Sequence, residues 1–451
     1  MRTAVVGAGA SGLSLALLLD GEVVVYEAAA DPGGHCRAMV VEGFTFDEGP
    51  HIMFSKDQAV LDFMIRSLGG NVHRSRRNNR VCIDGSFVKY PIENDLAGLP
   101  EDLRNRCLLD FLFNEHAALA EHPANLDEWF LGNFGAGLTD LYFRPYNEKT
   151  WNVALAELSM AWSERIPQPP PEDVVKGALG MSTEGYLHQL YYHYPSTGGY
   201  EALTTAWAGL VPTGALRLST PVRALVPGAD GVEVVTDDGH EVFDRVVCTA
   251  PMPAMLGMMP AIPDPVRAAV DNLQFNPLAA VTLGFLGDDP HEFTAVYFPD
   301  PAFLVNRISA PCVFSPHNGP PGCYSIQAEI TDREGGSSLA LSDDELIAHV
   351  HGGLVRYGLV PESHPLVLSH VQRLEYAYVV YTVDYERHVE TVRTWAEAQG
   401  VFIHGRFGAF EYLNVDGCVI RSLDMATKLN GRPTMLDEIS LESIPMRATP
   451  A

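Results

Sequence analysis

The sequence has little positive charge and no long apolar run. Its 451 residues carry 30 lysines and arginines against 57 aspartates and glutamates, a net charge of −27. This excess of negative charge argues against nucleic acid or an anionic membrane surface as a partner. No run approaches the length of a transmembrane helix. An anionic ligand would need a local group of arginines to overcome the overall charge.

Cysteine is also scarce. The seven cysteines are scattered, odd in number and free of C-x-x-C spacing. This predicts reduced thiols and a cytoplasmic protein. The sequence shows no metal-ligand spacing, so we predict no metal site. It also shows no internal repeat, no Ser/His/Asp set and no paired carboxylates. A hydrophobic content of 47% with 19% charge indicates a globular chain, long enough for two or three domains.

A strand, a glycine-rich turn, a helix and a second strand follow one another in the first 27 residues. Residues 3–6 form an apolar β-branched run, residues 13–19 carry leucines at helical spacing, and residues 23–26 form a second run. The pattern G-x-G-x-x-G stands between the first strand and the helix, at Gly7, Gly9 and Gly12. In this context it predicts a dinucleotide-binding βαβ unit.

Each residue of this pattern has a physical role. Gly7 permits the tight turn, Gly9 lets a pyrophosphate approach the backbone, and Gly12 lets helix and strand pack closely. Glu27, fifteen residues past Gly12, would accept hydrogen bonds from a ribose hydroxyl. Because an acid here opposes a 2′-phosphate, FAD or NAD is favoured over NADP. A signal peptide is excluded because only Arg2 is positive and no A-x-A cleavage site follows.

Two loops follow the βαβ unit. Residues 28–37 contain Gly33 and Gly34, which allow a loop to lie against a ligand. NAD enzymes do not need this loop, whereas it is similar to the loop after the first βαβ unit in many FAD oxidoreductases. Residues 44–54 alternate and then turn at Gly-Pro, and the composition of this loop alone favours a structural role for His51.

The hydrophobic patterns after residue 54 divide the rest of the chain into segments with different expected secondary structure. Residues 81–92 alternate around Asp84-Gly85, a hairpin signal, and residues 95–190 show the helical spacing of an insertion. A return to the nucleotide domain is expected from strands at 216–225, 232–236 and 241–249. An antiparallel sheet is expected from strands at 303–308, 312–315, 324–330 and 366–381, with a helix at 343–357. The closing elements are a helix at 389–399, a strand at 401–404, a loop at 405–416, a helix at 420–428 and a mobile polar tail.

We therefore predict an α/β protein, in which a Rossmann-type FAD-binding domain carries a helical insertion and an antiparallel-sheet substrate domain. The FAD-binding domain is expected at residues 1–85, 195–255 and 395–430. The helical substrate domain is expected at 95–190, the antiparallel domain at 86–94 and 256–394, and the tail at 431–451.

Three stretches resemble the UDP-galactopyranose mutases, relatives of the FAD-dependent amine oxidases and protoporphyrinogen oxidases. Tyr146–Trp151, with Arg165 fourteen residues later, resembles the pattern Y-x-E-K-x-W…R. Gly49–Phe54 resembles the mutase loop that faces the flavin, and Gly405–Asp416 resembles the segment G-R-x-G…Y-x-D. The resemblance covers most of residues 1–428.

The resemblance implies roles for individual residues. Tyr146 would stack on the nucleotide base and Trp151 would line the sugar pocket. Arg165 and Arg307 would hold the diphosphate, and His51 would lie beside the isoalloxazine; these three are the catalytic candidates. The other substrate-binding candidates are Tyr378, Tyr412 and Asn414. The cofactor-binding candidates are Gly7, Gly9, Gly12, Glu27, Gly34, Val222, Gly405, Arg406 and Asp416.

The same resemblance implies a flavin-dependent nucleotide-sugar mutase, which interconverts the pyranose and furanose forms of a UDP-galactopyranose-like substrate. In such a reaction the N5 atom of reduced FAD attacks the anomeric carbon, while arginines stabilise the departing diphosphate. NAD(P)H is a candidate external reductant, and self-association stays open. Asn414 stands where many bacterial mutases have Asp, so the identity of the sugar also stays open.

Two other functions stay open. One is a FAD-dependent oxidase or dehydrogenase of the amine oxidase or protoporphyrinogen oxidase type; the other is a non-catalytic flavin-binding protein. The arginine pair and Tyr412 discriminate, because they suit an anionic diphosphate and have no role with a neutral amine. These residues could instead have purely structural roles. Arg165 and Arg307 would then form surface ion pairs, and Tyr146 and Trp151 would pack in a helical core.

Overall fold

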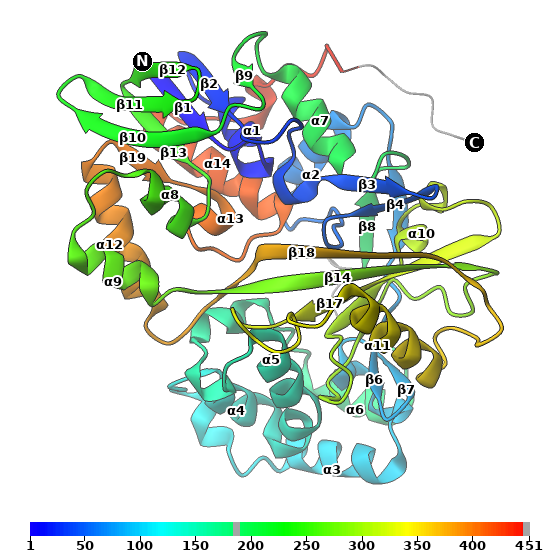
Figure 1. Cartoon of the computed structure of the whole chain (residues 1–451). Coiled ribbons are helices and arrows are strands. Elements are labelled where there is room, and N and C mark those ends of the chain that lie inside the picture. Colours follow the sequence, from blue (N-terminus) through cyan, green and yellow to red (C-terminus); the bar gives the residue numbers. More distant parts are fainter. Residues whose placement is uncertain (184–189, 445–451) are drawn as a thin grey trace.

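The computed structural model describes residues 1–183 and 190–444. A parallel sheet with its helices lies at one end, a long sheet crosses the middle, and a helical region lies at the other end (Figure 1). The expected helical segment and tail reach into residues 184–189 and 445–451, which lie outside the described part. None of the helices described is long and apolar enough to span a bilayer.

The parallel sheet confirms the predicted Rossmann-type fold. Its strand order is β19-β13-β1-β2-β9, and every neighbouring pair runs parallel. The strands are β1 (Arg2–Val6), β2 (Glu22–Tyr26), β9 (Leu216–Arg217), β13 (Arg245–Cys248) and β19 (Val401–Ile403). Helices α1 (Ala10–Ala16) and α14 (Val415–Asn430) pack against one another on this region. Strands from the two ends and the middle of the chain thus form one sheet.

Smaller elements surround this sheet. An antiparallel sheet consists of β10 (Val222–Gly228), β11 (Gly231–Thr236) and β12 (Gly239–Phe243). Two strand pairs join β3 (Ala38–Val41) to β4 (Phe44–Asp47) and β5 (His73–Arg76) to β8 (Tyr191–Tyr194). The helices here are α2 (Gln58–Ser67), α7 (Glu201–Leu210), α8 (Met252–Met258), α9 (Asp264–Asp271), α12 (Tyr385–Ala398) and α13 (Gly405–Gly408).

The second large sheet has seven strands in the order β18-β14-β17-β16-β15-β6-β7. It is antiparallel except between β15 and β6. Its strands are β6 (Asn79–Ile83), β7 (Ser86–Lys89), β14 (Gln274–Leu286), β15 (Ala295–Tyr297), β16 (Arg307–Ser309), β17 (Cys323–Thr331) and β18 (Leu366–Val380). Helix α11 (Asp343–Arg356) packs on β14 and β18. Both strands of the predicted hairpin belong to this sheet, so residues 79–83 lie with it and not with the parallel sheet.

Several local predictions were wrong. The expected strands at 216–225 and 241–249 are each divided between two strands of different sheets, β9 and β10 in the first case and β12 and β13 in the second. The expected strand at 312–315 is the short helix α10 (Pro311–Phe314), because Pro311 suits a first helical turn and a short apolar run does not distinguish a strand from a buried helix. The expected strand at 303–308 is regular only from Arg307. Residues 405–416 are not all loop, since α13 begins at Gly405 and the closing helix begins at Val415.

The helical region confirms the predicted insertion. It contains α3 (Glu101–Leu112), α4 (Leu126–Leu138), α5 (Arg144–Trp151) and α6 (Pro171–Ala178). Aromatic rings fill its interior, and Phe130 stacks on Phe143 with 4.4 Å between ring centroids. Lys149 of the Y-x-E-K-x-W stretch donates hydrogen bonds to three backbone carbonyls, those of Phe298, Asp300 and Val305. This lysine therefore attaches α5 to the seven-stranded sheet region.

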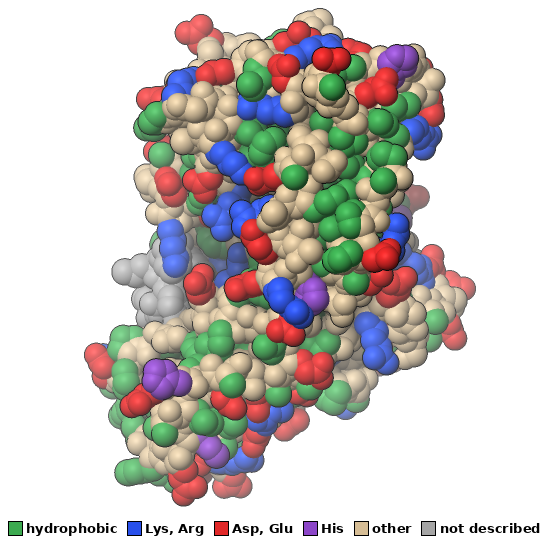
Figure 2. All heavy atoms as spheres, turned by 90° about the vertical axis from the view of Figure 1, so that its left-hand side faces the viewer, with side chains coloured by type: hydrophobic (Ala, Val, Ile, Leu, Met, Phe, Trp, Pro, Cys, Tyr) green, Lys and Arg blue, Asp and Glu red, His purple; other side chains and the backbone are tan. Residues whose placement is uncertain are grey.

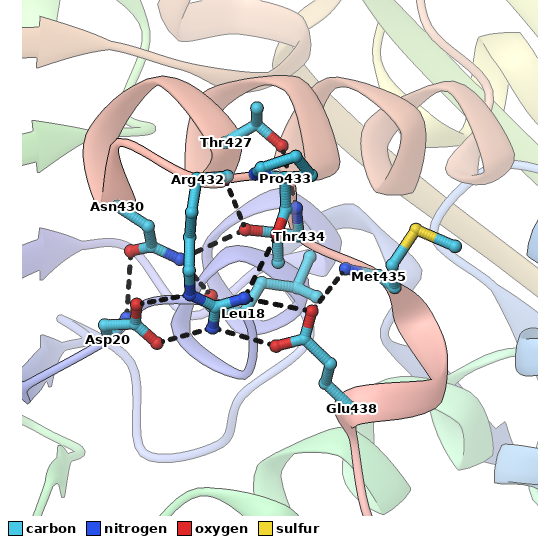
Figure 3. Close-up of polar contacts among 9 residues, drawn as sticks. All are labelled: Leu18, Asp20, Thr427, Asn430, Arg432, Pro433, Thr434, Met435 and Glu438. Carbon is cyan, nitrogen blue, oxygen red and sulfur yellow. Dashed lines mark hydrogen bonds and ion pairs between the residues drawn. The ribbon is translucent and has the colours of Figure 1, made fainter.

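The first part of the tail is held in place, contrary to the expectation of a mobile tail. Arg432 makes paired hydrogen bonds to Asp20, at 2.8 and 2.9 Å, and to Glu438, at 2.8 and 3.1 Å (Figure 3). Asn430 donates to the carbonyl of Leu18 at 2.9 Å. Leu436 is buried against the core around α1. The polar composition concealed the partners Leu18 and Asp20, each of which lies 412 residues from its tail residue in the sequence.

Candidate functional site

One cavity of about 590 Å³ is lined by both the parallel-sheet region and the seven-stranded sheet. Basic side chains gather around a hollow in the middle of the face shown in Figure 2. The lining includes eleven predicted site residues: Gly7, Gly9, Glu27, Gly34, His51, Val222, Arg307, Tyr378, Arg406, Tyr412 and Asn414. The fold therefore brings together residues that are up to 407 positions apart in the sequence (7 to 414).

The end of the cavity next to the parallel sheet is formed mainly by backbone atoms of the glycine loops. Gly7 has φ +101°, and a Cβ on Gly12 would lie 1.9 Å from the carbonyl oxygen of Gly7. A Cβ on Gly34 would lie 3.1 Å from the Cα of Gly9, so the two glycine loops touch. The carboxylate of Glu27 accepts hydrogen bonds from the N–H groups of Ala8 at 2.7 Å and Ala29 at 2.9 Å. These contacts leave a narrow backbone cradle with an acid at its rim.

The donors at this end suit a flavin dinucleotide. Arg406 donates to the carbonyls of Leu413 at 3.0 Å and Ala377 at 2.9 Å, but its buried Nε has no hydrogen-bond partner within the protein. The buried Nδ1 of His51 also has none. Phosphates and the carbonyl groups of a flavin ring would supply the missing acceptors. The residues present therefore fit FAD.

His51 is neutral at physiological pH. Burial and, to a smaller extent, the positive charge of Arg406 lower the pKa of its imidazole to about 3. The ring packs on Tyr200, with 5.2 Å between centroids. His51 therefore offers a neutral ring nitrogen to the cavity and no imidazolium charge.

Side chains of the large sheet build the other end of the cavity. Arg307 on β16 lies directly across from Glu329 on β17, and its Nε donates to that carboxylate. Tyr378 on β18 donates to the other oxygen of Glu329 at 3.1 Å. Burial lowers the pKa of Arg307, but the charge and the hydrogen bond of Glu329, together with Tyr378 and Tyr297, outweigh this effect and hold the pKa well above its ordinary value. Arg307 is therefore charged and held in a fixed position.

An aromatic layer joins the two ends. Tyr378 and Tyr412 stack with 5.8 Å between centroids and 11° between ring planes. The guanidinium of Arg406 lies 4.3 Å from the centroid of Tyr412. Trp151 packs edge-on against both tyrosines from behind, at 5.6 and 5.9 Å. Two tyrosine side chains and an arginine thus face the cavity between cradle and sheet.

Six predicted site residues do not line this cavity: Gly12, Tyr146, Trp151, Arg165, Gly405 and Asp416. Trp151 is buried and stacks on Trp162 at 4.0 Å, and Tyr146 packs between Tyr142 and Tyr297. Arg165 donates to the backbone carbonyl of Tyr412, and its guanidinium lies 4.8 Å from that ring. Arg165 and Arg307 are thus linked through the tyrosine pair but do not face each other across the cavity.

Four lining residues of the sheet end were missed by the sequence reasoning: Arg77, Asn79, Tyr297 and Glu329. A signal for the first two existed, since residues 74–80 hold four arginines in a chain with an excess of acid. Glu329 is the one charged residue of β17, and its side chain is only 4% exposed. A charged residue inside a buried strand indicates a partner, but the sequence does not identify which. Within residues 1–183 and 190–444, no group of three His, Cys, Asp or Glu side chains could hold a metal ion.

Comparisons with known proteins agree with this geometry. The structure matches that of a reduced UDP-galactopyranose mutase with a TM-score of 0.88 and 25% identity, over 95% of this chain and 94% of the other. It matches a candidate protoporphyrinogen oxidase from Exiguobacterium sp. 255-15 with a TM-score of 0.72 and 20% identity, over 95% of this chain and 98% of the other. The second likeness is one of fold alone. The first confirms the fold expected from the mutase resemblance.

The sequence is also 38% identical, over 284 residues, to a zeta-carotene-forming phytoene desaturase from Myxococcus xanthus. That match spans 56% of this chain and about half the length of the relative, 54%. Residues 10–429 match the family described as flavin containing amine oxidoreductase. The chain therefore belongs to the flavin-containing amine oxidoreductase family.

Proposed function

We propose that this protein is a nucleotide-sugar mutase that uses reduced FAD to interconvert pyranose and furanose forms of a nucleoside-diphosphate sugar. The supporting observation is that the cofactor cradle shares one cavity with a fixed, charged Arg307 and two tyrosine side chains. Reduced flavin would supply the nucleophile for the anomeric carbon. NAD(P)H remains the candidate reductant.

The chain's own residues would bind and orient the substrate. Arg307 and Arg406 would place positive charge next to the diphosphate, and the hydroxyls of Tyr378 and Tyr412 would donate to its oxygens. Charge fixed in a buried site stabilises a departing anion without reorganisation. We propose Arg307 with Arg406 in place of the expected pair of Arg307 with Arg165, because Arg406 lines the cavity and Arg165 does not.

The chemistry of the sheet end argues against an ammonium substrate and against a hydrocarbon substrate. An ammonium substrate would meet three guanidinium groups on the cavity wall, those of Arg77, Arg307 and Arg406, and the carboxylate of Glu329 is already paired with Arg307. A hydrocarbon such as phytoene would bury the polar groups of Asn79, Arg307 and Glu329 without replacing their hydrogen bonds to water. A diphosphate sugar offers acceptors and hydroxyls to the same groups.

The test is product analysis. Dithionite-reduced protein is incubated with a panel of nucleotide sugars, and chromatography with NMR detects an isomer of unchanged mass that has a furanose ring. Oxidised protein is the control and should form no product. Added UDP should also change the flavin fluorescence. Absence of any isomer together with no response to nucleoside diphosphates, but oxidation of an amine or a polyene, would overturn the proposal in favour of an oxidase.

A further inference from the structure

Asp47 is a buried carboxylate next to the cavity that the proposed reaction does not use. It ends β4, is 3% exposed and does not line the cavity itself. Its two oxygens accept hydrogen bonds from the hydroxyl of Tyr194 at 3.0 and 2.9 Å, and one accepts from the backbone N–H of Tyr200 at 2.8 Å. The backbone N–H of His51 donates to the same carboxylate. One side chain therefore joins β8, the start of α7 and the loop that carries His51.

Neighbouring residues pack tightly around Asp47. Gly199 has φ +65°, and a Cβ there would lie 2.3 Å from the Cβ of Ala38 and 2.9 Å from Oδ1 of Asp47. Gln327 on β17 donates to the backbone carbonyl of Asp47 at 2.9 Å. Tyr200, whose N–H is bound by Asp47, packs its ring on the imidazole of His51. Asp47 thus acts on His51 twice, through the backbone of His51 and through the ring of Tyr200.

We propose that Asp47 is a positioning residue, which fixes the orientation of His51 toward the cavity by binding the N–H groups of His51 and Tyr200 with one carboxylate. The proposal goes beyond the mutase reaction. It depends on flavin binding, which membership of the family supports, and it does not depend on the substrate.

The ionisation of Asp47 should control this contact. Burial raises the pKa of Asp47 to about 7, against the lowering effect of its donors at Tyr200, Tyr194 and His51. The other titratable groups that face it are Cys36 and Glu201. Below this pKa the carboxyl gains a proton and loses acceptor capacity, so the anchored N–H groups loosen; above it, all donors are bound.

The experiment follows the visible spectrum of protein-bound oxidised FAD from about pH 5.5 to about pH 8.5. The wild-type protein should show a spectral transition with a midpoint near the pKa of Asp47. Asp47→Asn should abolish it and keep the low-pH spectrum throughout, because the amide resembles the protonated acid. Glu93→Gln changes another buried carboxyl, in the region of the helical insertion, and should keep the transition.

A second variant covers the case in which Asp47→Asn does not fold or load FAD. Tyr194→Phe removes one donor but leaves the contacts with Tyr200 and His51. Losing a hydrogen bond to the charged form should move the midpoint up by about 0.5–1 pH unit. A transition that keeps its midpoint in both variants belongs to another group and overturns the proposal. So does a wild-type spectrum that is constant with pH and identical to that of Asp47→Asn.

Discussion

The two ends of the cavity are built by different means. At the cofactor end, backbone from the glycine loops at residues 7–11 and 33–34 forms much of the wall, and these two loops are close in sequence. At the sheet end the wall consists of side chains from β6, β16, β17 and β18, which lie up to 299 residues apart (79 to 378). A local backbone motif keeps its geometry from one fold to another, whereas a set of remote side chains depends on strand register. The cofactor is therefore the better determined ligand, and the substrate has to be inferred from a few charged groups.

The largest effect should come from the cofactor end. Gly12→Val places side-chain atoms where a Cβ would already be 1.9 Å from the carbonyl oxygen of Gly7, so helix and strand are forced apart. We expect loss of FAD from the purified protein, measured as the ratio of flavin to protein absorbance. Gly352→Ala on α11 is the control, because a Cβ there meets nothing within 4 Å and alanine favours a helix. Full FAD content in Gly12→Val would mean that this motif does not hold the cofactor.

The next largest effect should come from the sheet end. Arg307→Ala leaves the carboxylate of Glu329 buried without its partner, which should cost about 3 kcal/mol of unfolding free energy, measured in urea. It should also weaken UDP binding about a hundredfold in a flavin fluorescence titration.

The double variant Arg307→Met/Glu329→Met separates these two effects. It should recover most of the stability, since no charge is left unpaired, but not the UDP affinity. FAD content should stay normal in both variants if the two ends are independent. Equal UDP binding by the wild-type protein and both variants would remove Arg307 from the substrate site.

A smaller effect, dependent on pH, should come from the helical region. Glu93 is buried without a hydrogen-bond partner for its carboxyl oxygens, and burial raises its pKa to about 8. The native state therefore holds this proton more tightly than the unfolded state, and the contribution of Glu93 to stability falls as pH rises from its ordinary pKa to about 8. Glu93→Gln should match the wild-type Tm at acidic pH and exceed it by a margin that grows up to about pH 8 and then levels off. A Tm difference that is constant with pH would contradict this.

The smallest effect should come from the tail. Arg432→Ala removes the contacts to Asp20 and Glu438 (Figure 3) and should lower Tm slightly, more at low salt than at high salt, because exposed ion pairs are weak and screened. Arg387→Ala is a matched control with a single, longer contact of 3.8 Å to Asp384. Equal Tm values for the two variants at low salt would show that the tail network adds nothing.

The predictions from sequence differ in quality for physical reasons. The strand–glycine–helix unit was predicted well because its spacing is set by local chain geometry. The segment 312–315 was not, because a short apolar run fits either a strand or a buried helical turn. Arg165 was matched by motif, yet it binds the carbonyl of Tyr412. Glu329 was missed because nothing near it in sequence indicates its partner.

The sequence by itself determined the dinucleotide fold, its acid and the need for local arginines in a chain of net charge −27. Only the tertiary structure decided which arginines face the cavity, that Glu329 neutralises Arg307, and that Asp47 is joined to His51 and Tyr200. The physical reason is that burial and pairing set the charge state of these groups. Both depend on strands and loops that meet only when the whole chain is folded.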